Sequence, residues 1–272
     1  MENLAQPQLE QDGLDSKRSP SWWKESLMLR ERVKNPLLEE YKIRSSEKET
    51  DLLNFTNQEL SPEELIEIAD ALNAIATYTG GKIFDRVPGI VLASSDSFQE
   101  GAAGSFSPYF PAVMVNMDAM RNPPDDSYSA FTVSRFPGRK VTILQFILAH
   151  EYGHSMDLNY ITEVEAHGIN KDEANPDWMG YGNKTGSFCA FKHSLQPASD
   201  ERGLSRRARE GGPEEDFAES FAIASLGGEV RLMPDRYIKL AKTIKLAEGE
   251  QFIGPHKVEI KKVESLELAQ AA

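Results

Sequence analysis

The sequence predicts an α+β fold, with a small mixed sheet, one long helix beside it and a helical C-terminal half. Short β-type runs at residues 82–84, 89–94 and 112–117 are separated by Gly, Ser and Pro, as in a sheet with tight connections. The apolar run at residues 141–158 is typical of a buried helix. A second helix is predicted at residues 215–222, where apolar residues recur at helical spacing.

Composition limits the number of domains and the classes of partner. The 272 residues, 40% of them hydrophobic, are enough for one substantial core. We expect a partly disordered N-terminal extension at residues 1–50, one domain at residues 51–250 and a C-terminal tail at residues 251–272. The 43 acidic and 30 basic residues give a formal charge of -13, which disfavours nucleic acid and anionic membranes as partners.

The N-terminus and the cysteine content indicate a cytoplasmic protein. Residues 1–17 are polar and contain no apolar core of a signal peptide. No run of about 18 apolar residues occurs, so no transmembrane helix is expected. Cys189 is the single cysteine, which excludes an internal disulfide framework and fits a reducing compartment.

Residues 22–38 form an amphipathic stretch that begins with Trp22 and Trp23. We interpret it as a helix packed on the domain, and its alternative role is a docking site for a protein partner. Further along, Ser61 and Glu64 predict a capping box with Pro62 at the first helical position. The helix that they begin should end at Gly80-Gly81 and serve as scaffold.

Residues 150–154, His-Glu-Tyr-Gly-His, lie inside the long apolar run and carry the pattern HExxH. Four residues advance about 400° around a helix, so His150 and His154 project from nearly the same face. The two imidazoles could bind one Zn²⁺, and Glu151 could take a proton from a water bound to that ion. Two ordinary surface histidines are the alternative, but the apolar surroundings favour a buried helix. Gly153 suits a helix that packs closely on another element.

Catalytic zinc normally takes three protein ligands, so a third donor is expected. Asp157 and Tyr160 stand where the longer motif HExxHxxGxxH requires glycine and histidine, which excludes that class. The helix should close near Leu158. Residues 159–212 then form a long polar stretch that could line or cover a cleft.

Glu215 and Glu219 share one flank of the second helix, which Pro213 begins. We favour Glu215 as the third ligand and Glu219 as the hydrogen-bond partner of a ligand histidine. Glu219 could instead be the direct ligand. Glu173 is a rival, but Pro176 would interrupt its helix. The remaining alternatives are Cys189, His167 and His193.

The β-run before the long helix could contribute to substrate binding. If residues 113–116 form an edge strand, they can pair with the backbone of an extended peptide. The alternative is that neighbouring strands occupy both sides of this strand. The glycine-rich segment 101–104 lacks the lysine and hydroxyl pair of a phosphate loop, so a hairpin connection is favoured there.

Residues 150–154 followed by residues 215–222 resemble the zincin metallopeptidases, and among them the catalytic domain of the anthrax lethal factor family. The resemblance covers roughly residues 89–246 and is specific in these two motifs. It implies that Glu215 binds zinc and that Glu219 supports a ligand histidine. That family places a tyrosine shortly before the glutamate ligand to stabilise the oxyanion, whereas residues 206–209 here read Arg-Arg-Ala-Arg. Arg207 is our candidate for that role, with Tyr181 and His193 as alternatives.

The sequence therefore predicts a zinc-dependent endopeptidase whose partner is a protein or peptide substrate. Glu151 and Arg207 are the expected catalytic residues, and His150, His154 and Glu215 are the expected metal ligands. The alternative is a zinc-binding regulatory or docking module of the same fold with weak catalysis. A non-peptide amidase with the same zinc chemistry would differ in the shape of its cleft.

Overall fold

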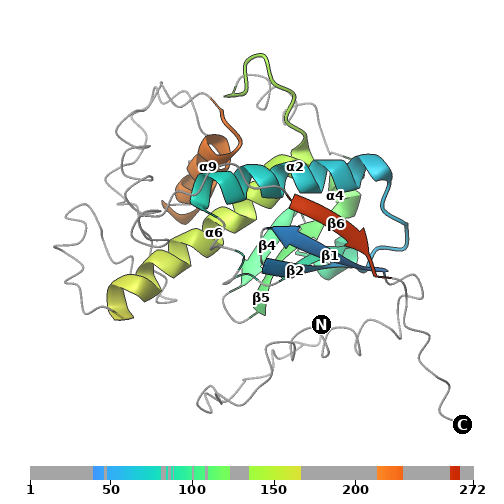
Figure 1. Ribbon diagram of the computed structural model, residues 1–272, viewed down its shortest axis with the longest axis horizontal. Helices are drawn as coiled ribbons and strands as arrows, with labels where there is room; N and C mark the ends of the chain where they lie inside the picture. The colour runs from blue at the N-terminus through green and yellow to red at the C-terminus, as the bar shows by residue number, and fades with distance from the viewer. Residues whose placement is uncertain are drawn as a thin grey trace, which may run out of the picture. The chain divides into compact units, whose positions relative to one another are not determined.

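Six strands of the described residues form one mixed sheet in the order β4-β5-β3-β2-β1-β6 (Figure 1). The computed structural model describes residues 39–45, 48–80, 84, 87, 89–99, 101–107, 110–122, 135–166, 213–228 and 258–263. The strands are β1 (Glu39–Ser45), β2 (Lys48–Asn54), β3 (Gly89–Ala93), β4 (Gly104–Ser107), β5 (Phe110–Asn116) and β6 (Val258–Lys262). The helices are α2 (Pro62–Thr79), the 3₁₀ turn η1 (Ser95–Ser97), α4 (Met117–Arg121), α6 (Ile143–Ala166) and α9 (Pro213–Ser225).

The centre of the sheet is parallel and its flanks are antiparallel. β2 pairs parallel with β3, and β3 pairs parallel with β5, whereas β4, β1 and β6 each pair antiparallel with a neighbour. All five residues of β3 are buried, as expected for an apolar strand in the middle of a sheet. The predicted α+β class and the mixed sheet are therefore confirmed.

Helices α2 and α6 cover one face of this sheet (Figure 1). Cross-strand neighbours Leu52, Ile90 and Val113 share a row that faces the helices. The helices pack apolar residues at helical spacing against this row, so the sheet and the helices form a single core. From α2 and α6 the core takes Ile68, Leu72, Ile75, Leu144, Ile147 and Leu148.

The predicted start of α2 is confirmed. The Ser61 hydroxyl accepts a hydrogen bond from Glu64 N–H at 3.1 Å, and the Glu64 carboxylate accepts one from Ser61 N–H at 2.8 Å. The helix ends at Gly80, whose φ of 77° lies in the left-handed region, as predicted for a glycine C-cap.

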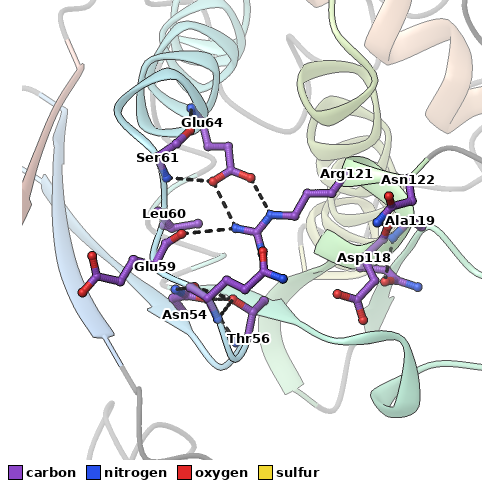
Figure 2. A network of polar contacts seen from close by, with 12 residues as sticks. Asn54, Thr56, Glu59, Leu60, Ser61, Glu64, Asp118, Ala119, Arg121 and Asn122 are labelled. Carbon is purple, nitrogen blue, oxygen red and sulfur yellow. Dashed lines mark hydrogen bonds and ion pairs between the residues drawn. The ribbon is translucent and has the colours of Figure 1, made fainter.

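Arg121 connects this capping box to the end of β5 (Figure 2). Its Nε donates to Glu64 Oε1 at 2.7 Å and its Nη2 donates to Glu64 Oε2 at 3.1 Å. Burial alone would raise the pKa of Glu64, but hydrogen bonds from Arg121 and Ser61 outweigh it and lower that pKa. The ion pair therefore ties the beginning of α2 to α4.

Strands β1 and β6 lie outside the range 51–250 predicted for the domain. β1 falls in the expected N-terminal extension and β6 in the expected C-terminal tail, and the two pair with each other in the sheet. Tyr41 and Ile43 of β1 are buried whereas Lys42 and Arg44 face outward, so the strand is polar along half its length. The predicted bounds are therefore corrected to include residues from 39 to 262. The residue 22–38 stretch lies outside the described residues.

Helix α6 is longer than predicted. It begins with a second capping box, in which Thr142 Oγ1 accepts from Gln145 N–H at 3.3 Å and Gln145 Oε1 accepts from Thr142 N–H at 3.0 Å. It runs to Ala166 and not to the expected end near Leu158. Residues 159–166 contain neither Gly nor Pro, so nothing in the sequence stops the helix there.

Within the described part of the chain, no helix is both long and apolar enough to cross a membrane.

Candidate metal centre

The two histidines of the HExxH motif lie one turn apart on the same side of α6. Their ring centroids are 4.8 Å apart, and the rings stand at 83° to each other. His150 is 9% exposed and His154 is partly buried. The imidazoles therefore converge on one small volume beneath the protein surface.

Glu215 of α9 completes this cluster. Its Oε2 lies 3.3 Å from His150 Nε2, and its Oε1 lies 3.7 Å from His154 Nε2. One donor atom from each of the three side chains can be chosen so that all lie within 4.8 Å of one another. In the described ranges this is the one group of three such side chains close enough to hold a metal ion. The structure thus brings together two segments that are 61 residues apart (215 − 154).

Gly153 allows α9 to approach α6 at backbone distance. A Cβ at position 153 would lie 2.7 Å from Cα and 2.9 Å from the carbonyl oxygen of Ala218, both shorter than real Cβ contacts. The proposed role of Gly153 in close helix packing is therefore confirmed. Phe217 and Phe221 are fully buried beside this contact and fix the rotation of α9, which presents Glu215 to the histidines.

Hydrogen bonds hold the C-terminal end of α9. Gly227, with φ of 73°, donates to Ala224 O at 3.1 Å, and Gly228 donates to Ile223 O at 2.7 Å, which is a Schellman motif. Arg139, from the segment before α6, donates to Leu226 O at 3.0 Å. The guanidinium thus satisfies a carbonyl at the negative end of α9.

Three carboxylates surround the imidazole pair. Burial lowers the pKa of His150, but the Glu215 carboxylate 3.3 Å away and the charges of Glu151 and Glu219 outweigh burial and raise that pKa. Glu151 and Glu219 are 6% and 2% exposed. Buried carboxylates in such number beside two imidazoles make a negative site that a divalent cation would neutralise.

Glu151 lies between α6 and the edge strand β4. Its carboxylate is so close to Gly104 that a Cβ at position 104 would lie 2.6 Å from Oε1. The charge of Glu151 acts on His150, and its oxygens are not part of the three-residue cluster. The carboxylate thus lies beside the cluster and is not one of its three candidate ligands.

Several residues named from the sequence lie outside the described residues. These are Arg207, Tyr181 and His193 for the oxyanion, and Glu173, His167, Cys189 and again His193 as alternative ligands. Glu219 lies one turn beyond Glu215 on α9, and its hydrogen bond to a ligand histidine stays a prediction.

Residues 113–116 do not form an edge strand, and the alternative that neighbouring strands occupy both sides of this strand is confirmed. They belong to β5, which pairs with β3 on one side and with β4 on the other, so its backbone groups are already used. The strand beside α6 at the edge of the sheet is β4. Gly104, which we placed in a hairpin connection, is the first residue of that strand.

A polar cavity of about 260 Å³ lies at the carboxyl ends of β2, β3 and β5, next to Arg121 (Figure 2). The Thr56 hydroxyl is engaged with Asn54 and Gln58, and Asp118 accepts a hydrogen bond from Ser95 N–H. These groups hold the loops after the strands. The side chains that line the cavity therefore serve to hold these loops in place. None of the lining residues is a histidine, so the cavity is separate from the candidate metal centre.

No family model, curated protein or solved structure matches this chain.

Proposed function

We propose that this protein is a zinc-dependent endopeptidase. The observation that supports the proposal is the convergence of His150, His154 and Glu215 on one volume with Glu151 beside it. Two imidazoles and one carboxylate are a frequent ligand set of catalytic zinc, which keeps a position open for water or substrate.

The donor set fits zinc in spacing and in charge. Tetrahedral zinc with bonds of about 2.1 Å holds its ligand atoms about 3.4 Å apart. The distances of 3.3 Å and 3.7 Å from Glu215 to the two histidines are close to that value. Zinc, when bound, supplies a Lewis acid that polarises a carbonyl and acidifies a water molecule.

Three further residues of the chain have proposed roles in the reaction. Glu151 accepts a proton from the attacking water on its carboxylate and donates it to the leaving amine. Glu219 orients a ligand histidine through its second ring nitrogen. Arg207 donates to the oxygen that becomes negative during the attack.

Strand β4 offers a place for the backbone of an extended substrate. Asn116 N–H donates to Ala103 O, which makes this a hydrogen-bonded pair of the β4–β5 ladder. In an antiparallel ladder such pairs alternate with non-bonded ones, so the N–H and C=O of Gly104 point away from β5. A peptide that pairs with this edge would lie next to Glu151.

Zinc content and peptide cleavage together test the proposal. The full chain, loaded with zinc, is analysed for bound metal and assayed on an unbiased library of quenched fluorescent peptides. We expect one zinc per chain and cleavage that Glu151→Gln lowers by about 10²- to 10⁴-fold while zinc stays bound. Glu63→Gln, an exposed glutamate on α2, is the matched control and should leave cleavage unchanged. Cleavage by Glu151→Gln at the wild-type rate would refute the assigned base.

A zinc-binding docking module is the second candidate. The observation that favours it is the sequence Arg-Arg-Ala-Arg at residues 206–209, where the zincin resemblance requires a tyrosine. This candidate predicts stoichiometric zinc with no cleavage of any library peptide. A single cleavage at a defined bond, lost in Glu151→Gln, would eliminate it.

A further inference from the structure

We infer that Gly104 is a positioning residue, which sets the place of the Glu151 carboxylate by leaving out a side chain. The inference rests on the proposed function of Glu151 as the base. A Cβ built at position 104 would lie 2.6 Å from Oε1, 2.8 Å from Cγ and 2.9 Å from Cδ of Glu151. The end of the glutamate therefore occupies the space that any other residue at position 104 would fill.

The backbone at Gly104 does not itself require glycine. Residues 80, 101, 138 and 227 are the glycines with positive φ among the described residues, and Gly104 is not one of them. An L-amino acid can thus adopt the strand conformation at this position. The three nearest heavy atoms that a Cβ at position 104 would meet all belong to the Glu151 side chain.

The register of the sheet points the missing side chain at α6. Gly104 pairs with Val115, and Val115 pairs with Leu92, so all three face the same side of the sheet. Val115 and Leu92 belong to the core that packs against α6. A side chain at position 104 would follow them toward the helix and meet Glu151.

Neither strand β4 nor helix α6 can easily move to relieve this contact. Asn116 holds β4 through its N–H on Ala103 O at 3.0 Å and its side-chain Nδ2 on Ala102 O at 2.9 Å. Helix α6 is held from its other side by the backbone contact of Gly153 with Ala218. Between these two backbones the Glu151 side chain can change its rotamer, so an added methyl group should displace the carboxylate and leave the fold intact.

Gly104→Ala should therefore lower the rate of catalysis and leave zinc binding unchanged. The carboxylate must shift by about 1 Å, and a misplacement of that size can cost roughly 10²-fold in rate. The three side chains of the metal cluster do not contact position 104 in this way, so zinc stoichiometry and affinity should stay within about twofold of wild type. We expect kcat to fall by roughly 10²-fold with KM nearly unchanged.

The first arm of the test examines the contact without any substrate. Melting temperatures are measured for zinc-loaded full-length wild type, Gly104→Ala, Glu151→Ala and the double variant. If the contact is present, Gly104→Ala lowers the melting temperature in the Glu151 background and not in the Glu151→Ala background. An equal decrease in both backgrounds would overturn the inference, whatever the enzymology.

The second arm measures cleavage of a peptide identified from the library. Gly101→Ala is the matched control, because a Cβ there meets no atom within 4 Å and only its left-handed backbone is strained. A fall in kcat for Gly104→Ala but not for Gly101→Ala supports the inference, and wild-type kcat in Gly104→Ala refutes it. Wild-type protein that binds zinc and cleaves no peptide would refute the proposed function itself. The melting temperatures do not depend on cleavage, so they test the contact between Gly104 and Glu151 separately.

Discussion

Gly153 of α6 and Ala218 of α9 make a contact between backbones, with a Cβ at position 153 excluded by the Ala218 Cα at 2.7 Å. This contact joins the two helices that carry the candidate metal ligands, with His150 and His154 on α6 and Glu215 on α9. The close approach of the two helices, on which the distance from Glu215 to the imidazoles depends, thus requires the absence of a side chain at position 153.

Replacing Gly153 with alanine should weaken zinc binding and stability together. The added methyl meets main-chain atoms, which cannot rotate away, so α9 must move and carry Glu215 with it. We expect a loss of about 1–3 kcal/mol in the free energy of unfolding, as for overpacked cores. Zinc affinity, measured by chelator competition, should fall as well.

Gly138→Ala is the control for this change. Its Cβ would meet no atom within 4 Å, so only the strain of a left-handed backbone is added. Unchanged zinc affinity in Gly153→Ala would show that the helix spacing does not control the metal cluster.

Glu215 and Glu219 should differ in how strongly they affect zinc. A partner that supports a ligand typically accounts for 10- to 100-fold in metal affinity, whereas loss of the ligand itself costs more. We therefore expect Glu219→Gln to lower zinc affinity by roughly 10- to 100-fold and Glu215→Gln to lower it further. A larger loss in Glu219→Gln, measured by the same competition, would exchange the two roles.

The convergence of His150 and His154 was predictable because the geometry of this pair is encoded locally. The spacing of His150 and His154 places both imidazoles on one face of any helix, and the apolar residues around them indicate where that helix is buried. Gly153 carried a further signal, since a glycine inside a helix usually marks a close approach. Two short motifs thus contained enough information to bring Glu215 into the same hypothesis.

The edge of the sheet was not predictable in this way. β4 has four residues and begins with a glycine, so its pattern is too short to distinguish from a turn. β5 has a clear strand pattern, but a strand pattern does not reveal which neighbours pair with it. The position of β4 depends on pairing between segments, which local sequence does not report.

Strands β1 and β6 were missed for a related reason. Their outward faces carry Lys42, Arg44, Glu259 and Lys261, and such charges resemble those of a polar extension. Charged residues on an edge strand also discourage pairing with other chains, and β6 is the edge opposite β4. The charges that discourage pairing of this edge with other chains therefore also make β6 hard to recognise as a strand from the sequence.

The Glu64–Arg121 pair should make stability depend on pH. The pKa of Glu64 is lowered from its ordinary value of 4.5 in the folded protein, so folding is favoured while the carboxylate is ionised. This contribution is present above the unfolded pKa and is lost as the pH falls through the lower folded pKa. Glu64→Gln should thus cost about 2 kcal/mol near neutral pH, and progressively less below about pH 4.5.

Urea unfolding of wild type and Glu64→Gln at a series of pH values measures this difference. Glu63→Gln, one residue away and exposed, is the matched control for removing a charge from the first turn of α2. A difference between wild type and Glu64→Gln that stays constant down to about pH 3 would contradict the role of the ionised carboxylate.

Gly227 and Arg139 should be coupled at the end of α9. Three glycines with similar φ, at 79° for Gly101, 76° for Gly138 and 73° for Gly227, share the strain of a left-handed alanine, about 1 kcal/mol or slightly more. Only at Gly227 would the Cβ also meet a side chain, at 2.1 Å from Nη1 of Arg139. Gly227→Ala should therefore displace the guanidinium and lose its hydrogen bond to Leu226 O, for a further cost of about 1 kcal/mol.

A double-mutant cycle isolates that further cost. In the Arg139→Ala background the space beside Gly227 is open, so Gly227→Ala should cost no more than Gly138→Ala does in wild type. The free energies come from urea unfolding of the four proteins in the cycle and of Gly138→Ala. If Gly227→Ala costs the same with and without Arg139, the guanidinium does not occupy that space in solution, and the end of α9 is held by its Schellman hydrogen bonds alone.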